Sequence, residues 1–168
     1  SQGLGAMLVF LFWVSAFGAL FSYFLYPVVI SLLPARQART EARLLSGKLP
    51  RVSLIVTAHN EADRIRGKLE NCLSLDYPYL EIIIASDASS DETDHIVREY
   101  GVRGVKLARA DERKGKEYAQ LQAIKVAAGD ILVFSDVATS IPQGAIALIV
   151  AYFDDPAVGA VSSEDRFI

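Results

Sequence analysis

The chain has 168 residues, enough for one domain of ordinary size, and 52% of them are hydrophobic. Its 17 Lys and Arg residues face 20 Asp and Glu residues, and the net charge of -3 gives no sign of a nucleic-acid partner. With Cys72 as the single cysteine and only two histidines, His59 and His95, a disulfide framework, a cysteine zinc site and a His-rich metal cluster are excluded.

The first 35 residues contain no charged side chain. Within them, residues 7–33 (MLVFLFWVSAFGALFSYFLYPVVISLL) are almost wholly apolar or aromatic. A helix needs about 20 apolar residues to cross a bilayer, and this run is longer. We expect residues 1–35 to form one retained transmembrane helix, kinked or ended near Pro27. A signal peptide is the alternative, but no basic segment precedes the run, and the run is longer than the apolar region of a signal peptide.

Basic residues follow this helix and none precedes it: Arg36, Arg39, Arg43, Lys48 and Arg51. Basic residues favour the cytoplasmic side of a membrane. The sequence therefore predicts a single-pass protein of the inner (cytoplasmic) membrane, with the remaining part in the cytoplasm. Residues 36–49 are expected to form a basic juxtamembrane linker. A solvated linker helix is compatible with residues 36–45 lying along the membrane surface in contact with anionic lipid.

From residue 50 onward, short apolar runs alternate with segments of helical periodicity. Strands are expected at residues 52–57, 80–85, 105–108, 131–135 and 158–162. The helices between them are expected to be capped by Asn60 and by Ser89 or Ser90, to cover residues 116–128 with Leu121, Ile124 and Ala128 inward, and to begin near Pro142. Such alternation predicts an α/β fold with a mostly parallel sheet and helices on both faces.

Polar side chains follow three of the predicted strands, and in open parallel sheets ligands bind beyond the strands' carboxyl ends. They lie in residues 57–61, in residues 86–91 and at residues 135–136. A basic loop, residues 113–116, leads into a helix whose first N–H groups suit a phosphate. The combination predicts a site for a base or ribose at one end and a diphosphate, with or without a metal, at the other. Each part alone is common in turns and solvated loops.

Several familiar sites are absent from the sequence. There is no G-x-G-x-x-G after the first strand and no G-x-x-x-x-G-K-[ST] anywhere. No Ser-His-Asp arrangement and no H-E-x-x-H is found. A nucleotidyltransferase is a further possibility, but it is disfavoured because no glycine-rich phosphate loop lies near the first strand.

Three segments carry a resemblance to a known family: VSLIVTAHNEADRIRGKLENCLSLDYP, LEIIIASDASSDETDHI and KGKEYAQLQAIKVAAGDILVFSDVAT. In order and spacing they resemble the nucleotide-binding half of a family-2 inverting glycosyltransferase of the GT-A fold. The likeness covers residues 50–163. It implies a Rossmann-like (GT-A) nucleotide-sugar-binding part over residues 50–168 that stops before the acceptor half, preceded here by the transmembrane helix.

The resemblance also implies roles for individual residues. Those expected to bind the nucleotide are Thr57, Ala58, His59, Glu61, Asp87, Lys116, Ser135 and Asp136. Asp136 matches the first Asp of the family's D-x-D and is the expected metal ligand. No catalytic base is assigned: Glu164–Asp165 resembles the family's E-D base but follows Asp136 too closely.

The implied activity is transfer of a sugar from a UDP-linked donor to a lipid-linked or polysaccharide acceptor at the cytoplasmic membrane face. A divalent cation, Mg²⁺ or Mn²⁺, would neutralise the leaving UDP. A second chain or a C-terminal half would complete the enzyme. The chain departs from the family pattern at Ser86, Ala88 and Ala138, and Ala138 replaces the second Asp of the D-x-D. The alternative is therefore a catalytically inactive nucleotide-binding or assembly module.

Overall fold

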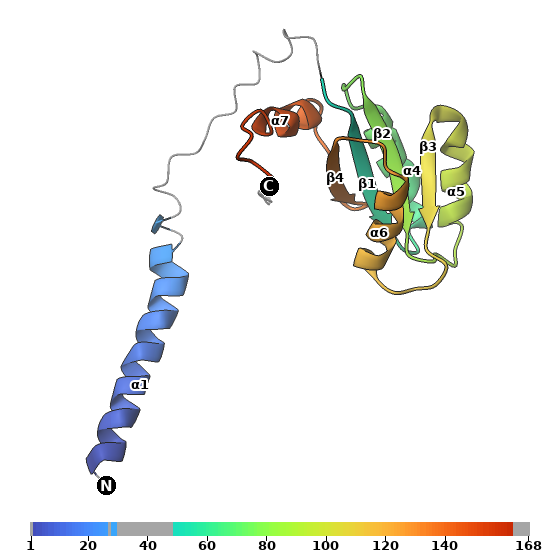
Figure 1. The fold of residues 1–168 in the computed structure, drawn as a ribbon. Coiled ribbons are helices and arrows are strands. Elements are labelled where there is room, and N and C mark those ends of the chain that lie inside the picture. The colour runs from blue at the N-terminus through green and yellow to red at the C-terminus, as the bar shows by residue number, and fades with distance from the viewer. Residues whose placement is uncertain (1, 27, 30–48, 163–168) are drawn as a thin grey trace. The chain divides into compact units, whose positions relative to one another are not determined.

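The computed structural model describes residues 2–26, 28–29 and 49–162 (Figure 1). The chain divides into two compact units, residues 1–37 and residues 38–168. All of the predicted basic linker except Leu49 lies outside the described residues, as does the pair Glu164–Asp165.

The described part of the first unit contains an apolar helix. Its α-helical part, α1, spans Gln2–Leu20, and a π-helical turn, Phe21–Leu25, follows directly. Across residues 2–26, 28–29 and 49–162, no helix combines the length and the apolar character needed to cross a bilayer. This finding contradicts the predicted single-pass location in the inner membrane, and the predicted transmembrane helix is not found among these residues. The element α1 ends at Leu20, where the π-helical turn begins, and residues 27 and 30–33 of the apolar run lie outside the described part.

The second unit is built on a four-stranded sheet with the order β3-β2-β1-β4. Its strands are β1 (Val52–Ala58), β2 (Leu80–Ser86), β3 (Val105–Arg109) and β4 (Ile131–Asp136). All three pairings are parallel, which confirms the parallel α/β arrangement predicted from the alternation of strands and helices.

The predicted fifth strand is wrong. Residues 158–162 are described and form no strand, and β4 pairs only with β1 within the four-stranded sheet. Gly159 and Ala160 stand in the middle of this short run, and both residue types have low strand propensity. An apolar run without a partner strand does not gain the ladder of hydrogen bonds that would hold it extended.

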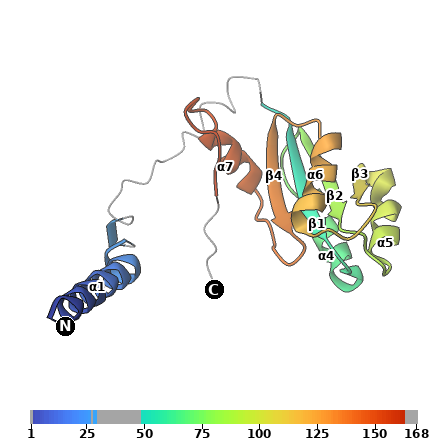
Figure 2. The same cartoon turned by 60° about the horizontal axis from the view of Figure 1, so that its bottom comes forward.

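Helices cover both faces of the sheet, as expected (Figures 1 and 2). On one face, Leu54 and Val56 of β1 pack in a core that also includes residues of α4 (Ala62–Leu73), α5 (Thr93–Glu99) and α7 (Ala145–Tyr152). On the other face, Ile55 packs in a smaller core with α6 (Lys116–Val126). Because β1 is buried on both faces, its sequence is mostly apolar rather than alternating, with Ser53 and Thr57 as its polar residues.

The predicted inward face of α6 is wrong. The buried residues of α6 are Ala119 and Ala123, whereas Leu121 and Ile124 are exposed, and the helix ends at Val126, before Ala128. Two alanines on one face let the helix lie close to the sheet with little side-chain entropy lost. Leucine and isoleucine at the neighbouring positions therefore stay outside the core.

Candidate functional site

The carboxyl ends of three strands meet at one edge of the sheet. In the pairing register, Thr57 of β1 stands beside Ala85 of β2 and beside Asp136 of β4. Ala58 pairs with Ser86, the last residue of β2. The loops that carry the predicted polar residues therefore start from the same level, as the spacing predicted.

The loops after β1 and β2 are joined by hydrogen bonds. The side-chain oxygen of Asn60 accepts the N–H of Ser90 at 2.8 Å. The N–H of Glu61 donates to the Thr93 hydroxyl at 2.8 Å, and the N–H of Ala62 donates to the Asp91 carboxylate at 3.0 Å. Side chains of each loop thus accept hydrogen bonds from backbone N–H groups of the other.

The predicted caps of the two helices that follow these loops are wrong. The N-cap residues are Glu61 for α4 and Glu92 for α5, and neither forms a side-chain capping bond. Asn60 and Ser90 are instead bonded to each other across the two loops. At the start of α4, the N–H groups of Glu61 and Ala62 donate to Thr93 and Asp91 of the neighbouring loop, which no local pattern reveals. At the start of α5, the Thr93 N–H donates to Asp91 of its own loop at 3.0 Å.

Asp87, just after β2, is buried and holds the basic loop. Its carboxylate accepts the N–H of Lys114 at 3.0 Å and the N–H of Gly115 at 3.1 Å. Its backbone carbonyl accepts a 2.7 Å hydrogen bond from Nδ1 of His59, so that nitrogen carries the proton. Gly115 has φ of 93°, a conformation that favours glycine. Asp87 thereby sets the entry of the loop into α6.

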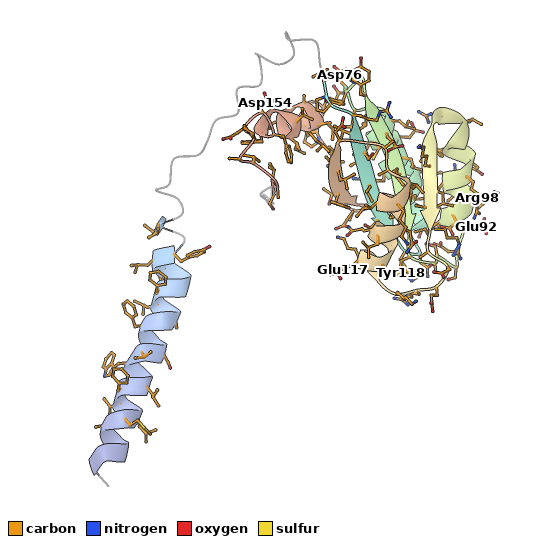
Figure 3. All side chains as sticks on the ribbon, in the orientation of Figure 1. Asp76, Glu92, Arg98, Glu117, Tyr118 and Asp154 are labelled. Atoms are coloured by element: carbon orange, nitrogen blue, oxygen red, sulfur yellow. The ribbon has the colours of Figure 1, made fainter. Side chains whose placement is uncertain are left out.

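A second set of contacts shapes the same loop. The Tyr118 hydroxyl donates to the Asp111 carboxylate at 2.8 Å, and the Lys114 ammonium lies 4.9 Å from the centre of the Tyr118 ring. Figure 3 shows Tyr118 and Glu117 at the start of α6, beside the loop that follows β3. These contacts hold the loop at both of its ends.

Lys116 and Asp136 form the charged centre of the site. The Lys116 ammonium donates to both carboxylate oxygens of Asp136, at 2.7 and 2.9 Å. The two side chains come from different elements, the start of α6 and the end of β4. Both are about half exposed, at 55% and 53%, so a ligand can reach them from solvent.

The other predicted residues differ in their contacts. The Thr57 hydroxyl accepts a 3.1 Å hydrogen bond from Gln120 of α6. Ala58 is buried, and its carbonyl accepts the N–H of Asp87. Glu61 lies apart from the Lys116–Asp136 pair in its contacts, with its carboxylate 4.0 Å from Arg64.

Two site residues escaped the sequence analysis. Gln120 contacts Thr57, and Lys68 of α4 donates from its buried ammonium to the Ser135 hydroxyl at 2.8 Å. Burial lowers the pKa of Lys68, and the Asp136 carboxylate opposes part of that effect. A signal for Lys68 was present, because it stands on the same helical face as the apolar Ile65 and Leu69.

The protein side chains do not by themselves make a metal site. Across the described ranges, no group of three or more His, Cys, Asp or Glu side chains is placed to hold an ion. Both oxygens of Asp136 receive the Lys116 ammonium, and Ala138 adds no ligand. A cation here would need most of its oxygen ligands from a bound diphosphate and water.

Comparison with known proteins gives a family and several relatives. Residues 53–167 match the family described as Glycosyl transferase family 2. The poly-beta-1,6-N-acetyl-D-glucosamine synthase of Staphylococcus epidermidis is 32% identical over 117 residues, which are 68% of this chain and 28% of that protein. The probable glycosyltransferase YdaM of Bacillus subtilis is 33% identical over 129 residues, which are 72% of this chain and 31% of that protein. The chain thus spans less than a third of these curated relatives.

Two solved structures share the fold. The mannosyltransferase PcManGT from Pyrobaculum calidifontis, solved in complex with GDP-Man and Mn²⁺, has a TM-score of 0.67 and 36% identity over 71% of this chain and 37% of that one. TarS 1-349 of S. aureus, solved in complex with UDP-GlcNAc, has a TM-score of 0.55 and 24% identity over 62% of this chain and 31% of that one, and shows the fold alone. This chain belongs to glycosyltransferase family 2, and its parallel four-stranded unit has a GT-A-like fold.

Proposed function

We propose that this chain forms the donor-binding part of an enzyme that transfers a sugar from a nucleotide-sugar to a glycan, either lipid-linked or a polysaccharide. The observation that carries the proposal is the joint position of Asp87, Lys116 and Asp136 at the strand ends of a family-2 fold. We propose UDP as the donor nucleotide. The relatives named as glycosyltransferases support sugar transfer in general.

The diphosphate is proposed to lie beside Lys116. A lysine ammonium at the N-terminal end of a helix combines a full positive charge with the positive end of the helix dipole. The base and ribose are proposed to lie toward Thr57, Ala58, His59, Glu61 and Ser135. Asp87 accepts one N–H at its Oδ2, so this oxygen can accept a second hydrogen bond from a base.

A divalent cation, Mg²⁺ or Mn²⁺, is proposed to contact Asp136 alone among the site's carboxylates. The mannosyltransferase PcManGT was solved with Mn²⁺ and GDP-Man, which supports the proposal without extending its metal to this chain. Such a cation supplies positive charge to the leaving diphosphate. Asp136 would have to exchange part of its contact with Lys116 for the ion.

In the proposed transfer, the acceptor hydroxyl oxygen forms a bond to the anomeric carbon of the sugar. The bond from that carbon to the diphosphate oxygen breaks, and UDP leaves with the electron pair. The hydroxyl proton passes to a general base. That base and the acceptor-binding residues are proposed to lie in a further part of the polypeptide or in a second chain, since the chain spans only 28% and 31% of its two relatives.

Calorimetric titration with UDP and with GDP, each with and without Mn²⁺, tests the donor site directly. Asp87→Ala and Asp136→Ala should each weaken binding of UDP strongly, and Glu117→Ala, which removes an exposed carboxylate from the same end of α6, should leave it nearly unchanged. Unchanged UDP affinity in both aspartate variants would contradict the proposal. Tighter binding of GDP than of UDP would change the proposed donor nucleotide.

A second candidate is a nucleotide-binding or assembly module without turnover. It is favoured by Ala138, which leaves the D-x-D position with one carboxylate. The test is donor hydrolysis or sugar transfer measured with metal and acceptor glycans present. Turnover that disappears in Asp136→Ala would rule this candidate out, whereas UDP binding without any turnover would favour it.

A further inference from the structure

Lys68 of α4 is a charged residue in the core, with only 4% of its surface exposed. Its ammonium donates to the Ser135 hydroxyl at 2.8 Å and to the Thr139 carbonyl oxygen at 2.5 Å. Both partners are uncharged. Burying an ammonium without an ion-pair partner is costly, and a well-packed apolar residue would serve the core better. The two contacts therefore need an explanation other than packing.

The two partners of Lys68 lie on either side of Asp136 in the chain. Ser135 precedes the carboxylate and Thr139 follows it. The turn between them is closed by its own hydrogen bond, from the Thr139 N–H to the Asp136 carbonyl at 3.2 Å. One ammonium thus holds both ends of the short segment that carries Asp136.

Asn71, one helical turn along α4, holds the next part of the same loop. Its side chain donates to the Ile141 carbonyl and accepts the Ile141 N–H, both at 2.9 Å. This amide clamp is neutral and lies beyond the Asp136 turn. The two side chains therefore differ in what they hold: Lys68 brackets Asp136, whereas Asn71 anchors the exit of the loop.

We propose that Lys68 is a positioning residue for the donor site, which fixes the Asp136 carboxylate opposite Lys116 by holding Ser135 and Thr139. The inference rests on the proposed function, because it takes Asp136 to contact the donor diphosphate or its cation. Lys68 does not touch the ligand. It acts through Asp136, and its effect on binding depends on that carboxylate.

A double-mutant cycle tests this dependence, with UDP affinity measured by NMR titration so that weak binding is still quantified. Lys68→Met should weaken UDP binding by about tenfold in the unmodified chain, because a misplaced binding group loses much of its contribution. In the Asp136→Ala background, Lys68→Met should weaken UDP binding by less than about twofold. Asn71→Leu, the matched control on the same loop, should cost less than about threefold in either background.

Equal losses for Lys68→Met in both backgrounds would overturn the proposal, as would an equal loss in Asn71→Leu. If Lys68→Met does not fold, Lys68→Gln, which keeps a neutral donor, replaces it in the same cycle. Amide hydrogen exchange tests whether Lys68 holds the turn around Asp136, independently of UDP binding. The Thr139 amide should exchange faster in the Lys68 variant than in Asn71→Leu, and unchanged exchange would overturn the clamp itself. An unmodified chain that binds neither UDP nor GDP would overturn the proposed function, and the role of Lys68 in it.

Discussion

The ammonium of Lys116 sits between the two carboxylate oxygens of Asp136, with nitrogen–oxygen distances of 2.7 and 2.9 Å. The pair joins the start of α6 to the end of β4 and places opposite charges side by side at the strand ends. Because both side chains are about half exposed, the pair contributes little to stability. The pair instead provides two groups that can contact a ligand: an ammonium for a diphosphate and a carboxylate for a metal ion or a ribose.

Lys116→Met should weaken binding of UDP by about tenfold, because a charge-assisted contact to the diphosphate is lost. Binding of uridine, which has no phosphate, should change by less than about twofold. Both affinities can be measured by titration. Lys125→Met removes a lysine from the other end of α6 and is the control for net charge. An equal loss for UDP and uridine would contradict a diphosphate contact.

Ala88→Gly should stabilise the fold by up to about 1 kcal/mol. Ala88 has φ of 49°, in the left-handed region that costs a side chain with a Cβ roughly 1 kcal/mol or more. Glycine removes that strain, although it also gains freedom in the unfolded chain. The reverse change at Gly104, with φ of 88° and open space around it, should destabilise. Urea denaturation measures both, and a loss of stability in Ala88→Gly would contradict the strain argument.

Gly129→Ala should destabilise the fold by about 1–3 kcal/mol. A Cβ at this position would lie 2.5 Å from the backbone nitrogen of Ser53 in β1, so the strand and the loop before β4 would have to move apart. Thermal or urea unfolding gives the size of the effect. Gly67→Ala is the matched control in α4, where the added Cβ meets nothing within 4 Å. That variant should gain up to about 1 kcal/mol from helix propensity.

Acid should destabilise the fold partly through Glu81. Burial would raise the pKa of Glu81, but hydrogen bonds from the Ala128 N–H, Lys106 and Ser53 outweigh it and lower the pKa to about 2 from 4.5. The ionised carboxylate therefore stabilises the folded chain above pH 4.5, and this contribution is lost as the pH falls from there toward 2. The difference corresponds to roughly 3 kcal/mol at most.

Urea denaturation at a series of pH values between these two pKa values measures the effect. Glu81→Gln should be less stable than the unmodified chain at neutral pH and should depend less on pH across this window. Glu117→Gln, which alters an exposed carboxylate on α6, should keep the full pH dependence. A steep loss of stability that persists unchanged in Glu81→Gln would assign the acid sensitivity to other carboxylates.

The sequence by itself determined the parallel α/β architecture and the edge of the sheet where the site lies. Mostly apolar runs such as Val52–Ala58 form stable strands only when both faces of the strand are buried. The helices that connect successive strands require parallel pairing. The polar residues after β1, β2 and β4 could be predicted to meet, because parallel strands end at the same edge. Residues 57, 87, 116 and 136 were all named from that pattern together with the family resemblance.

Tertiary structure alone decided how these residues are held. Lys68 stands on the apolar face of α4, which indicates burial, but only the packing of α4 against β4 places its ammonium against Ser135 and Thr139. The inward face of α6 is decided by the fit of Ala119 and Ala123 against the sheet, not by which of its residues are most apolar. Residues 158–162 include the strand-favouring Val158 and Val161 but have no partner strand. Local pattern predicts which elements form, whereas close packing and shared hydrogen bonds depend on contacts between residues far apart in the chain.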